Sequence, residues 1–421
     1  MIIAAGKIAR YVRGISLYFG ASAIPLMLSV IINPIIAMNM SPRDYAITGY
    51  FTSFNSLLTP LIQFYLIGYY LKQFFRLKRS ERIKLYALIF KNLIYLSAII
   101  TIFAMAILYI YIDLIHPTAI FPVLPYLILA IAPLSLAGIY NLRLADLRIR
   151  RKNGAYFRLS VAHGITGMLA TLLLVAVFHL GAIGKLSATL TVELIFFTTL
   201  IIAARRILSI DTHGVPMRPI ILFCAPLVAG AMMQYFADGY TATYLESLGN
   251  VTEYGLYIVG ASIGSYIMVF SCAVSAIFQP DFYHAIANSN RIALLNTLTT
   301  EFGIIILVVT TFIILAPYLV NVLTAGRYTA STYYARITSL GAITSAIFYR
   351  INSFSIATDH KTFYLFTTIT GSLAIIFSMP LVTRYYGYIG GAYLRATSYL
   401  IFAIINIILL KIAYQRKHRI Q

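Results

Sequence analysis

Positively charged side chains interrupt several long apolar stretches of this sequence. Arg336 lies about one helical turn, and Arg395 about two turns, inside such a stretch. A charge near the middle of a bilayer costs about 2.5 to 3.5 kcal/mol on insertion scales, so it usually faces a hydrated cavity. Each arginine could line a path for phosphate or acidic sugar groups, or reach back to the membrane surface beside tyrosines. Four further cations stand at or near the ends of apolar stretches and leave the same alternatives open: Arg43, Lys91, Arg158 and Arg350.

Two carboxylates are candidates for binding a coupling ion. Glu193 is the only carboxylate predicted near the middle of a helix, where it could take up a proton or Na⁺, or be a structural residue bonded to Thr189 or Thr198. Asp238 could line the rim of a cavity or be solvated in a loop. His163 is predicted to be a hydrogen-bonded core residue. The seven histidines show no spacing typical of metal ligands, so the sequence predicts no metal site.

Uncharged polar side chains form a second group of candidates. Asn55 and Gln63 are eight residues apart and therefore share one face of a helix. Their amides could bind sugar hydroxyls, or they could hydrogen-bond to a neighbouring helix. Gln234 stands one turn before Asp238 and is a similar candidate.

The composition indicates which elements must position these residues. Of the 421 residues 60% are apolar and 10% charged, and the mean hydropathy is +0.86, whereas soluble domains have about 25% charged residues. Twelve apolar runs reach the length of about 20 residues that a membrane-spanning helix needs: 15–38, 46–70, 86–110, 120–140, 158–178, 182–203, 219–238, 254–278, 298–322, 332–352, 362–382 and 388–411. The longest connections, 239–253 and 279–297, leave no room for a catalytic domain. The sequence predicts an all-α integral membrane protein that is not an enzyme and has no cofactor.

The distribution of lysine and arginine predicts the orientation of the chain. Both tails and every second connection together carry 22 of the 32 basic residues, whereas the opposite connections carry only Arg43, Arg327 and Arg384. Positive charge is retained on the cytoplasmic side, so both termini are predicted to be cytoplasmic. The basic segment 1–13 precedes a long apolar run without a cleavage pattern, which favours a retained first helix. The net charge of +20 is therefore interpreted as a topology signal and not as a nucleic-acid-binding face.

The two halves of the chain resemble each other. Three motifs of the first half return in the second, the first two after 204 and 206 residues: Ile165-Thr-Gly-Met-Leu-Ala170 as Ile369-Thr-Gly-Ser-Leu-Ala374, Gly181-Ala-Ile-Gly184 as Gly387-Tyr-Ile-Gly390, and Asp44-Tyr45 as Glu253-Tyr254. Because each half has six runs, an even number, both halves enter the membrane from the same side. We therefore expect two parallel six-helix repeats, 1–210 and 211–421, with a substrate site at their interface near the midplane.

Together with the basic segment Arg150-Arg-Lys-Asn-Gly154 and with Ala357-Thr-Asp-His-Lys-Thr362 before the eleventh run, these features resemble the polysaccharide (O-antigen or capsule) flippases of the multidrug/oligosaccharidyl-lipid/polysaccharide exporter superfamily. The resemblance covers the whole chain. It implies a V-shaped pair of six-helix bundles that alternates access and moves an undecaprenyl-pyrophosphate-linked oligosaccharide to the outer leaflet of the bacterial inner membrane. The family often has an Asp-Arg pair near the outer end of helix 7, but this chain has Asp238-Gly239, so only the acid matches. Helices 6 and 12, which carry Glu193 and Arg395, are mainly peripheral in the family.

Two functions from different classes remain open: a lipid-linked oligosaccharide flippase, and a multidrug or organic-cation antiporter of the same superfamily. Seven basic residues inside or at the ends of the helices favour the flippase, since organic cations require buried carboxylates. The predicted substrate-binding residues are Arg336, Arg43, Asn55, Gln63, Asp238, Gln234, Arg350, Arg158 and Arg395, and the coupling-ion candidates are Glu193 and Asp238. The expected partners are the lipid-linked oligosaccharide, membrane lipids, H⁺ or Na⁺, and other polysaccharide-assembly proteins, but no nucleic acid.

Overall fold

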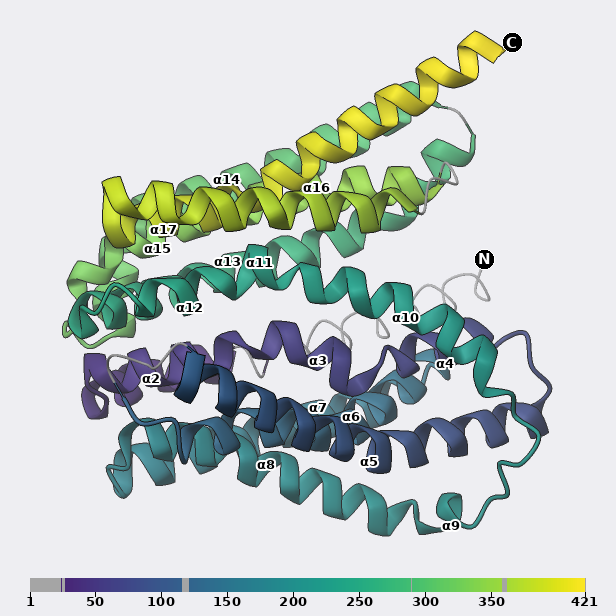
Figure 1. The fold of residues 1–421 in the computed structure, drawn as a ribbon, viewed down its shortest axis with the longest axis horizontal. Helices are drawn as coiled ribbons and strands as arrows, with labels where there is room; N and C mark the ends of the chain where they lie inside the picture. Colours follow the sequence, from purple (N-terminus) through teal and green to yellow (C-terminus); the bar gives the residue numbers. More distant parts are fainter. Residues whose placement is uncertain (1–23, 25–26, 116–120, 289, 358–361, 421) are drawn as a thin grey trace, which may run out of the picture. The chain divides into compact units, whose positions relative to one another are not determined.

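The computed structural model describes residues 24, 27–115, 121–288, 290–357 and 362–420, and every regular element in these ranges is a helix (Figure 1). The chain divides into two compact units, Met1–Val228 and Ala229–Gln421. The predicted fold class, an all-α membrane protein of two helical repeats, is confirmed. The repeat boundary at 210/211 stays a prediction.

The N-terminal unit packs α6 against α5 and α8, and α7 against α8. Short π-helical turns, Tyr111–Ile115 and Leu172–Val177, continue α5 and α7. The helices of this unit are Met27–Asn39, α2 (Pro42–Ser53), α3 (Asn55–Gln63), α4 (Leu66–Gln73), α5 (Arg79–Ile110), α6 (Tyr126–Ile149), α7 (Asn153–Thr171), α8 (Gly181–Ala203), α9 (Arg205–Leu208) and the first part of α10 (Met217–Met233).

The C-terminal unit packs α13 against α14 and α15, and α16 against α17. The backbone of α17 leaves helical geometry at Gly387, so this long element consists of two helices, as the eleventh and twelfth runs predict. The helices of this unit are the end of α10, α11 (Tyr235–Asp238), α12 (Tyr240–Glu246), α13 (Val251–Ala287), α14 (Arg291–Leu323), the 3₁₀ turn Thr329–Ser331, α15 (Thr332–Ser339), α16 (Gly341–Ala357) and α17 (Thr362–Ile420).

Two expectations about the helices are wrong. The run 46–70 is not one helix, because Phe64 and Tyr65 adopt left-handed backbone angles (φ 46° and 52°) that separate α3 from α4. The connection 279–297 is mostly helical, since α13 continues to Ala287 and α14 begins at Arg291. Hydropathy marks only the apolar part of a helix, so it misses polar turns that extend beyond the hydrocarbon.

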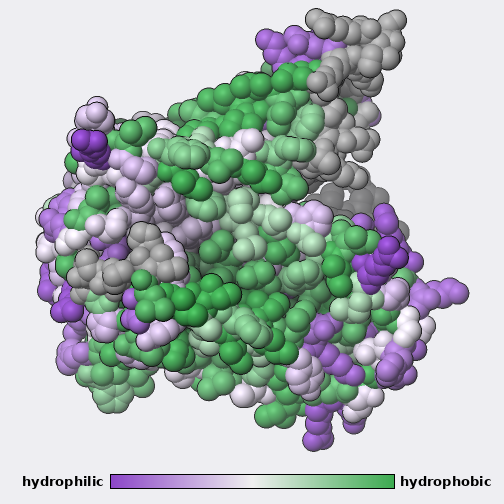
Figure 2. Space-filling view, viewed as in Figure 1, coloured by the Kyte–Doolittle hydropathy of each residue, from purple (hydrophilic) through white to green (hydrophobic). Residues whose placement is uncertain are grey.

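The apolar surface is that of a multi-pass membrane protein. Among the described residues, eight helices are long and apolar enough to cross a bilayer. The outer face of α5 is an example of such an apolar surface. Its large side chains recur at helical spacing and are each at least half exposed: Ile99, Ile102, Phe103 and Ile107. Figure 2 shows large areas of such apolar surface. Exposed isoleucine and phenylalanine side chains are stable against lipid and costly against water.

The same glycine turn opens the sixth helix of each repeat. Gly181 at the start of α8 and Gly387 in α17 have nearly identical φ angles of 54° and 55°, a region that L-residues with a side chain rarely adopt. Three residues later, Gly184 and Gly390 lie so close to the preceding helix that an added Cβ would be 2.7 Å from one of its carbonyl oxygens. The motif found in the sequence is therefore a matching structural element.

The second helix of each repeat is held at this turn. In the N-terminal unit, the Ala182 amide donates to Asp44 Oδ1 (2.9 Å), while Asp44 Oδ2 accepts from the Ser41 amide and hydroxyl at the start of α2. In the C-terminal unit, the Tyr388 hydroxyl lies 3.0 Å from the amide nitrogen and 3.2 Å from the carbonyl oxygen of Asn250, the residue that caps α13. Different side chains therefore make the same connection.

Replacing Gly181 by alanine tests this turn. The added Cβ would meet Asp44 Oδ1 at 2.5 Å in a left-handed backbone conformation, so we expect Gly181→Ala to lower the free energy of unfolding by at least about 1 kcal/mol. Gly154→Ala is the matched control, because a Cβ there meets nothing within 4 Å. Thermal unfolding of purified protein measures both, and equal midpoints for the two variants would show that the turn does not require glycine.

Candidate functional site

A buried ion pair joins three helices of the C-terminal unit. Arg350 Nε of α16 lies 2.9 and 2.7 Å from the two carboxylate oxygens of Glu301 in α14, and Nη2 donates to the Ser275 carbonyl of α13 (2.5 Å). The Ser275 hydroxyl donates to Glu301 Oε1 at 2.7 Å. The arginine side chain is 6% exposed and the glutamate 0%. The charge of Arg350 is therefore compensated within the protein.

The expectation that Glu193 is the only carboxylate near a helix middle is wrong, because Glu301 lies three turns inside α14. Starting the ninth run at residue 298 placed Glu301 at a helix end. Asn290 was the missing signal, since its side chain accepts a hydrogen bond from the Ala293 amide and caps α14 eleven residues before Glu301.

Arg350 lines two cavities of different character. One, of about 470 Å³, is almost wholly apolar and is bounded by side chains such as Phe282, Leu294 and Phe302. The other, of about 320 Å³, lies between α13 and α16 and is rich in hydroxyl and amide groups. Its polar lining consists of Ser271, Cys272, Ser275, Gln279, Ser345, Tyr349, Asn352 and Ser353. Within the described residues, Asn352 Oδ1 is buried and has no hydrogen-bond partner.

Arg336 of α15 is held by the neighbouring helix. Its Nε donates to the Ile313 carbonyl of α14 at 2.9 Å. In a regular helix the backbone N–H of residue 317 would donate to the Ile313 carbonyl, but residue 317 is proline and has no N–H. The guanidinium therefore satisfies a carbonyl that the proline leaves open, which is a structural use for an intramembrane cation that the sequence left undecided.

Asp238 and Arg395, which the sequence did not connect, belong to one cluster of the C-terminal unit. The Tyr399 hydroxyl donates to Asp238 Oδ2 (2.7 Å), and Arg395 Nη1 lies 3.5 Å from the Tyr257 hydroxyl. Arg395 also attracts the Asp238 carboxylate electrostatically. Residue 239, for which the family resemblance implies an arginine, is glycine in this chain. The cation of this cluster is Arg395, which belongs to α17.

Glu193 and His163 form a pair in the N-terminal unit. His163 Nε2 of α7 lies 3.1 Å from Glu193 Oε1 of α8, and the imidazole stacks on Tyr140 of α6 with ring centres 4.2 Å apart. Glu193 Oε2 is buried and has no hydrogen-bond partner within the described residues. Both side chains line a cavity of about 270 Å³. The sequence identified each residue alone but not the pair.

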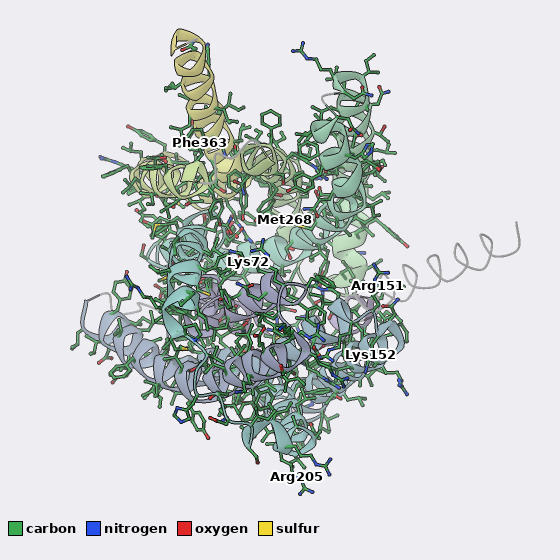
Figure 3. The ribbon with its side chains drawn as sticks, turned by 90° about the vertical axis from the view of Figure 1, so that its right-hand side faces the viewer. Lys72, Arg151, Lys152, Arg205, Met268 and Phe363 are labelled. Carbon is green, nitrogen blue, oxygen red and sulfur yellow. The ribbon has the colours of Figure 1, made fainter. Side chains whose placement is uncertain are left out.

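The other predicted residues are dispersed. Asn55 and Gln63 are the first and last residues of α3, where Gln63 Nε2 donates to the Leu134 carbonyl of α6 at 3.4 Å. Gln234 lies at the break between α10 and α11. Arg43 on α2 and Arg158 on α7 are exposed. Other basic side chains, Arg151, Lys152 and Arg205, point away from the body of the N-terminal unit in Figure 3.

The bond between Arg336 and Ile313 can be tested by a double-mutant cycle with Pro317. Pro317→Ala restores a backbone donor for Ile313, so Arg336→Ala should then cost less stability than in the native chain, by about 1 kcal/mol or more. Thermal unfolding midpoints of the four proteins measure this difference. An equal cost in both backgrounds would show that Arg336 does not substitute for the missing N–H.

The sequence matches no protein-family model and no curated protein. Solved structures do resemble the chain. An inward-facing multidrug resistance MATE family transporter of the MOP superfamily has a TM-score of 0.66 at 15% identity, covering 95% of this chain and 99% of that one. The lipid II flippase MurJ, in an inward closed conformation, has a TM-score of 0.65 at 15% identity, covering 95% and 87%. A MOP superfamily transporter from Pyrococcus furiosus, described by a binding pocket of reverse polarity, has a TM-score of 0.62 at 12% identity, covering 95% of each chain. The chain therefore has the fold of MOP superfamily transporters, a fold shared by multidrug transporters and a lipid flippase.

Proposed function

We propose that this protein is an alternating-access transporter that moves an anionic lipid-linked oligosaccharide, of the undecaprenyl-pyrophosphate type, to the outer leaflet of a bacterial inner membrane for polysaccharide biosynthesis. Its termini are expected in the cytoplasm, as the basic connections predict. The carrying observation is the charge of the chain, because its 32 lysines and arginines far outnumber its 12 acids.

The excess of basic over acidic side chains supports an anionic substrate. Of the four buried carboxylates in the described part of the chain, Asp146 and Glu301 contact arginines and Glu193 contacts His163. The whole chain has 32 lysines and arginines against 12 acids. An organic-cation antiporter would need a carboxylate available to its substrate, whereas a pyrophosphate group is stabilised by an excess of arginine.

The polar cavity between α13 and α16 supports a sugar head group. Serine hydroxyls and the Gln279 and Asn352 amides line it, and these groups exchange hydrogen bonds with sugar hydroxyls as readily as with water. The buried Asn352 oxygen without a partner is an acceptor that a sugar hydroxyl would satisfy. Arg336, Arg43, Arg158 and Arg395 remain the proposed anion-binding residues.

One of the two native thiols is exposed, which allows a direct test. Cys272 is exposed and lines the polar cavity, while Cys224 is buried in the N-terminal unit. In a Cys224→Ser chain, we expect the lipid-linked oligosaccharide to slow labelling of Cys272 by a small thiol reagent several-fold, because the glycan fills the cavity. Organic cations should leave the labelling rate unchanged.

Two controls make the result specific. A chain with Cys224→Ser and Cys272→Ser should take up no label, and adding Ser247→Cys to it supplies an exposed thiol outside the cavity whose labelling substrate should not affect. Protection of Cys272 by organic cations, without protection by the lipid-linked oligosaccharide, would instead support the antiporter.

A further inference from the structure

The cavity of about 270 Å³ in the N-terminal unit lies at the middle of two membrane-spanning helices. His163 is near the centre of the span Asn153–Val177, and Glu193 is near the centre of Gly181–Ala203. The third wall is the helix Met27–Asn39, which contributes Ser29 and Ile32. Glycines of α7, such as Gly164 and Gly167, leave the space open beside the two titratable side chains.

The pair has groups that could accept a further proton. The imidazole and the carboxylate share one short contact of 3.1 Å, and the second carboxylate oxygen, Glu193 Oε2, has no hydrogen-bond partner among the described residues. The glutamate is 11% exposed and the histidine 25%, so the imidazole is the more accessible partner. Histidine is the side chain that exchanges protons near neutral pH.

The other charged and titratable groups around the pair come from three helices. Tyr140 of α6 stacks on the imidazole, and Tyr156 is on α7 two turns before His163. Lys185 of α8 is two turns before Glu193, and its Nζ lies 5.0 Å from the centre of the Tyr45 ring. The described helix Met27–Asn39 contributes no titratable side chain. Among these described groups Glu193 is the only acid, and both members of the pair line the cavity.

We infer that His163 and Glu193 form a proton-binding site through which a proton gradient drives this transporter. In the empty site a neutral imidazole donates through Nε2 to the Glu193 carboxylate, and the pair has a net charge of −1. Binding one proton at Nδ1 gives an imidazolium beside the carboxylate and a net charge of 0. A pair without net charge is the form suited to a closed, dry cavity, whereas the charged form requires hydration, so protonation favours closure of the cavity.

The donor set favours a proton over a metal cation. No cluster of three or more histidine, cysteine or acidic side chains that could hold a metal ion occurs among the described residues. The cavity supplies one unpartnered carboxylate oxygen and neutral groups such as Thr171 and Thr189.

Direct proton uptake by the purified protein tests the site without reference to any substrate. Between about pH 5 and 8, native protein should take up about one proton more per chain than His163→Gln, as measured with a pH-indicator dye in weak buffer. Glu193→Gln should shift this uptake to lower pH, because the imidazolium has lost its carboxylate partner. Glu81→Gln and His179→Asn are matched controls at exposed positions outside the cavity. Their uptake curves should differ from that of the native chain only by the one group that each substitution removes. An uptake curve of Glu193→Gln that coincides with that of the native protein at every pH would overturn the inference.

Transport measurements test the coupling, which rests on the proposed function. In proteoliposomes, an imposed pH gradient should accelerate transport of the lipid-linked oligosaccharide by native protein and by both controls. In Glu193→Gln, the increase in transport rate caused by the gradient should be at least about tenfold smaller than in native protein. Transport that follows a sodium gradient and is unaffected by Glu193→Gln would overturn the coupling but leave the proposed function intact. Normal proton uptake without transport of this substrate would contradict the proposed function and leave the proton site standing.

Discussion

Compensation of buried charge is the constraint on which the structure depends. A carboxylate inside a bilayer has no water to solvate it, so it must contact donors supplied by the protein. Glu301 contacts Arg350 and a serine hydroxyl. Asp146, buried near the end of α6 beyond the predicted apolar run, accepts from Tyr70 at 2.5 Å and from Arg150 at 2.6 Å. These contacts join α13, α14 and α16 in one unit, and α4 and α6 in the other. Glu301 and Asp146 thereby hold helices together, and the remaining basic side chains give the chain its positive excess.

The two repeats meet this constraint with different residues on one backbone plan. Both open their sixth helix with a glycine at positive φ and tie that turn to the second helix, through Asp44 in one repeat and Tyr388 in the other. Their central polar groups differ more. The N-terminal unit has the His163–Glu193 pair beside a cavity, whereas the C-terminal unit has a closed ion pair beside a cavity lined by hydroxyls and amides. This difference assigns proton binding to the first unit and glycan contact to the second in the account proposed above.

Much of the fold could be predicted because hydropathy and recurring motifs report directly on helices that contact lipid. The glycine motifs at 181 and 387 even identified a turn that the structure repeats. The pairing of side chains could not be predicted, because it depends on which helices pack together. Nothing in the sequence placed His163 beside Glu193, thirty residues away, or the Ile313 carbonyl beside Arg336. The break at Phe64 and Tyr65 was missed for a related reason, since apolar residues at a helix break have the same hydropathy as those within a helix.

The central claim is that the transported molecule is an anionic lipid-linked oligosaccharide. Reconstitution of purified protein into liposomes that contain this lipid tests it most directly, with the glycan reaching the outer leaflet detected by an impermeant glycan-modifying reagent. The account predicts translocation that requires the protein and does not occur for an organic cation presented to the same vesicles. Translocation of the organic cation, with the lipid-linked oligosaccharide remaining in its original leaflet, would contradict it.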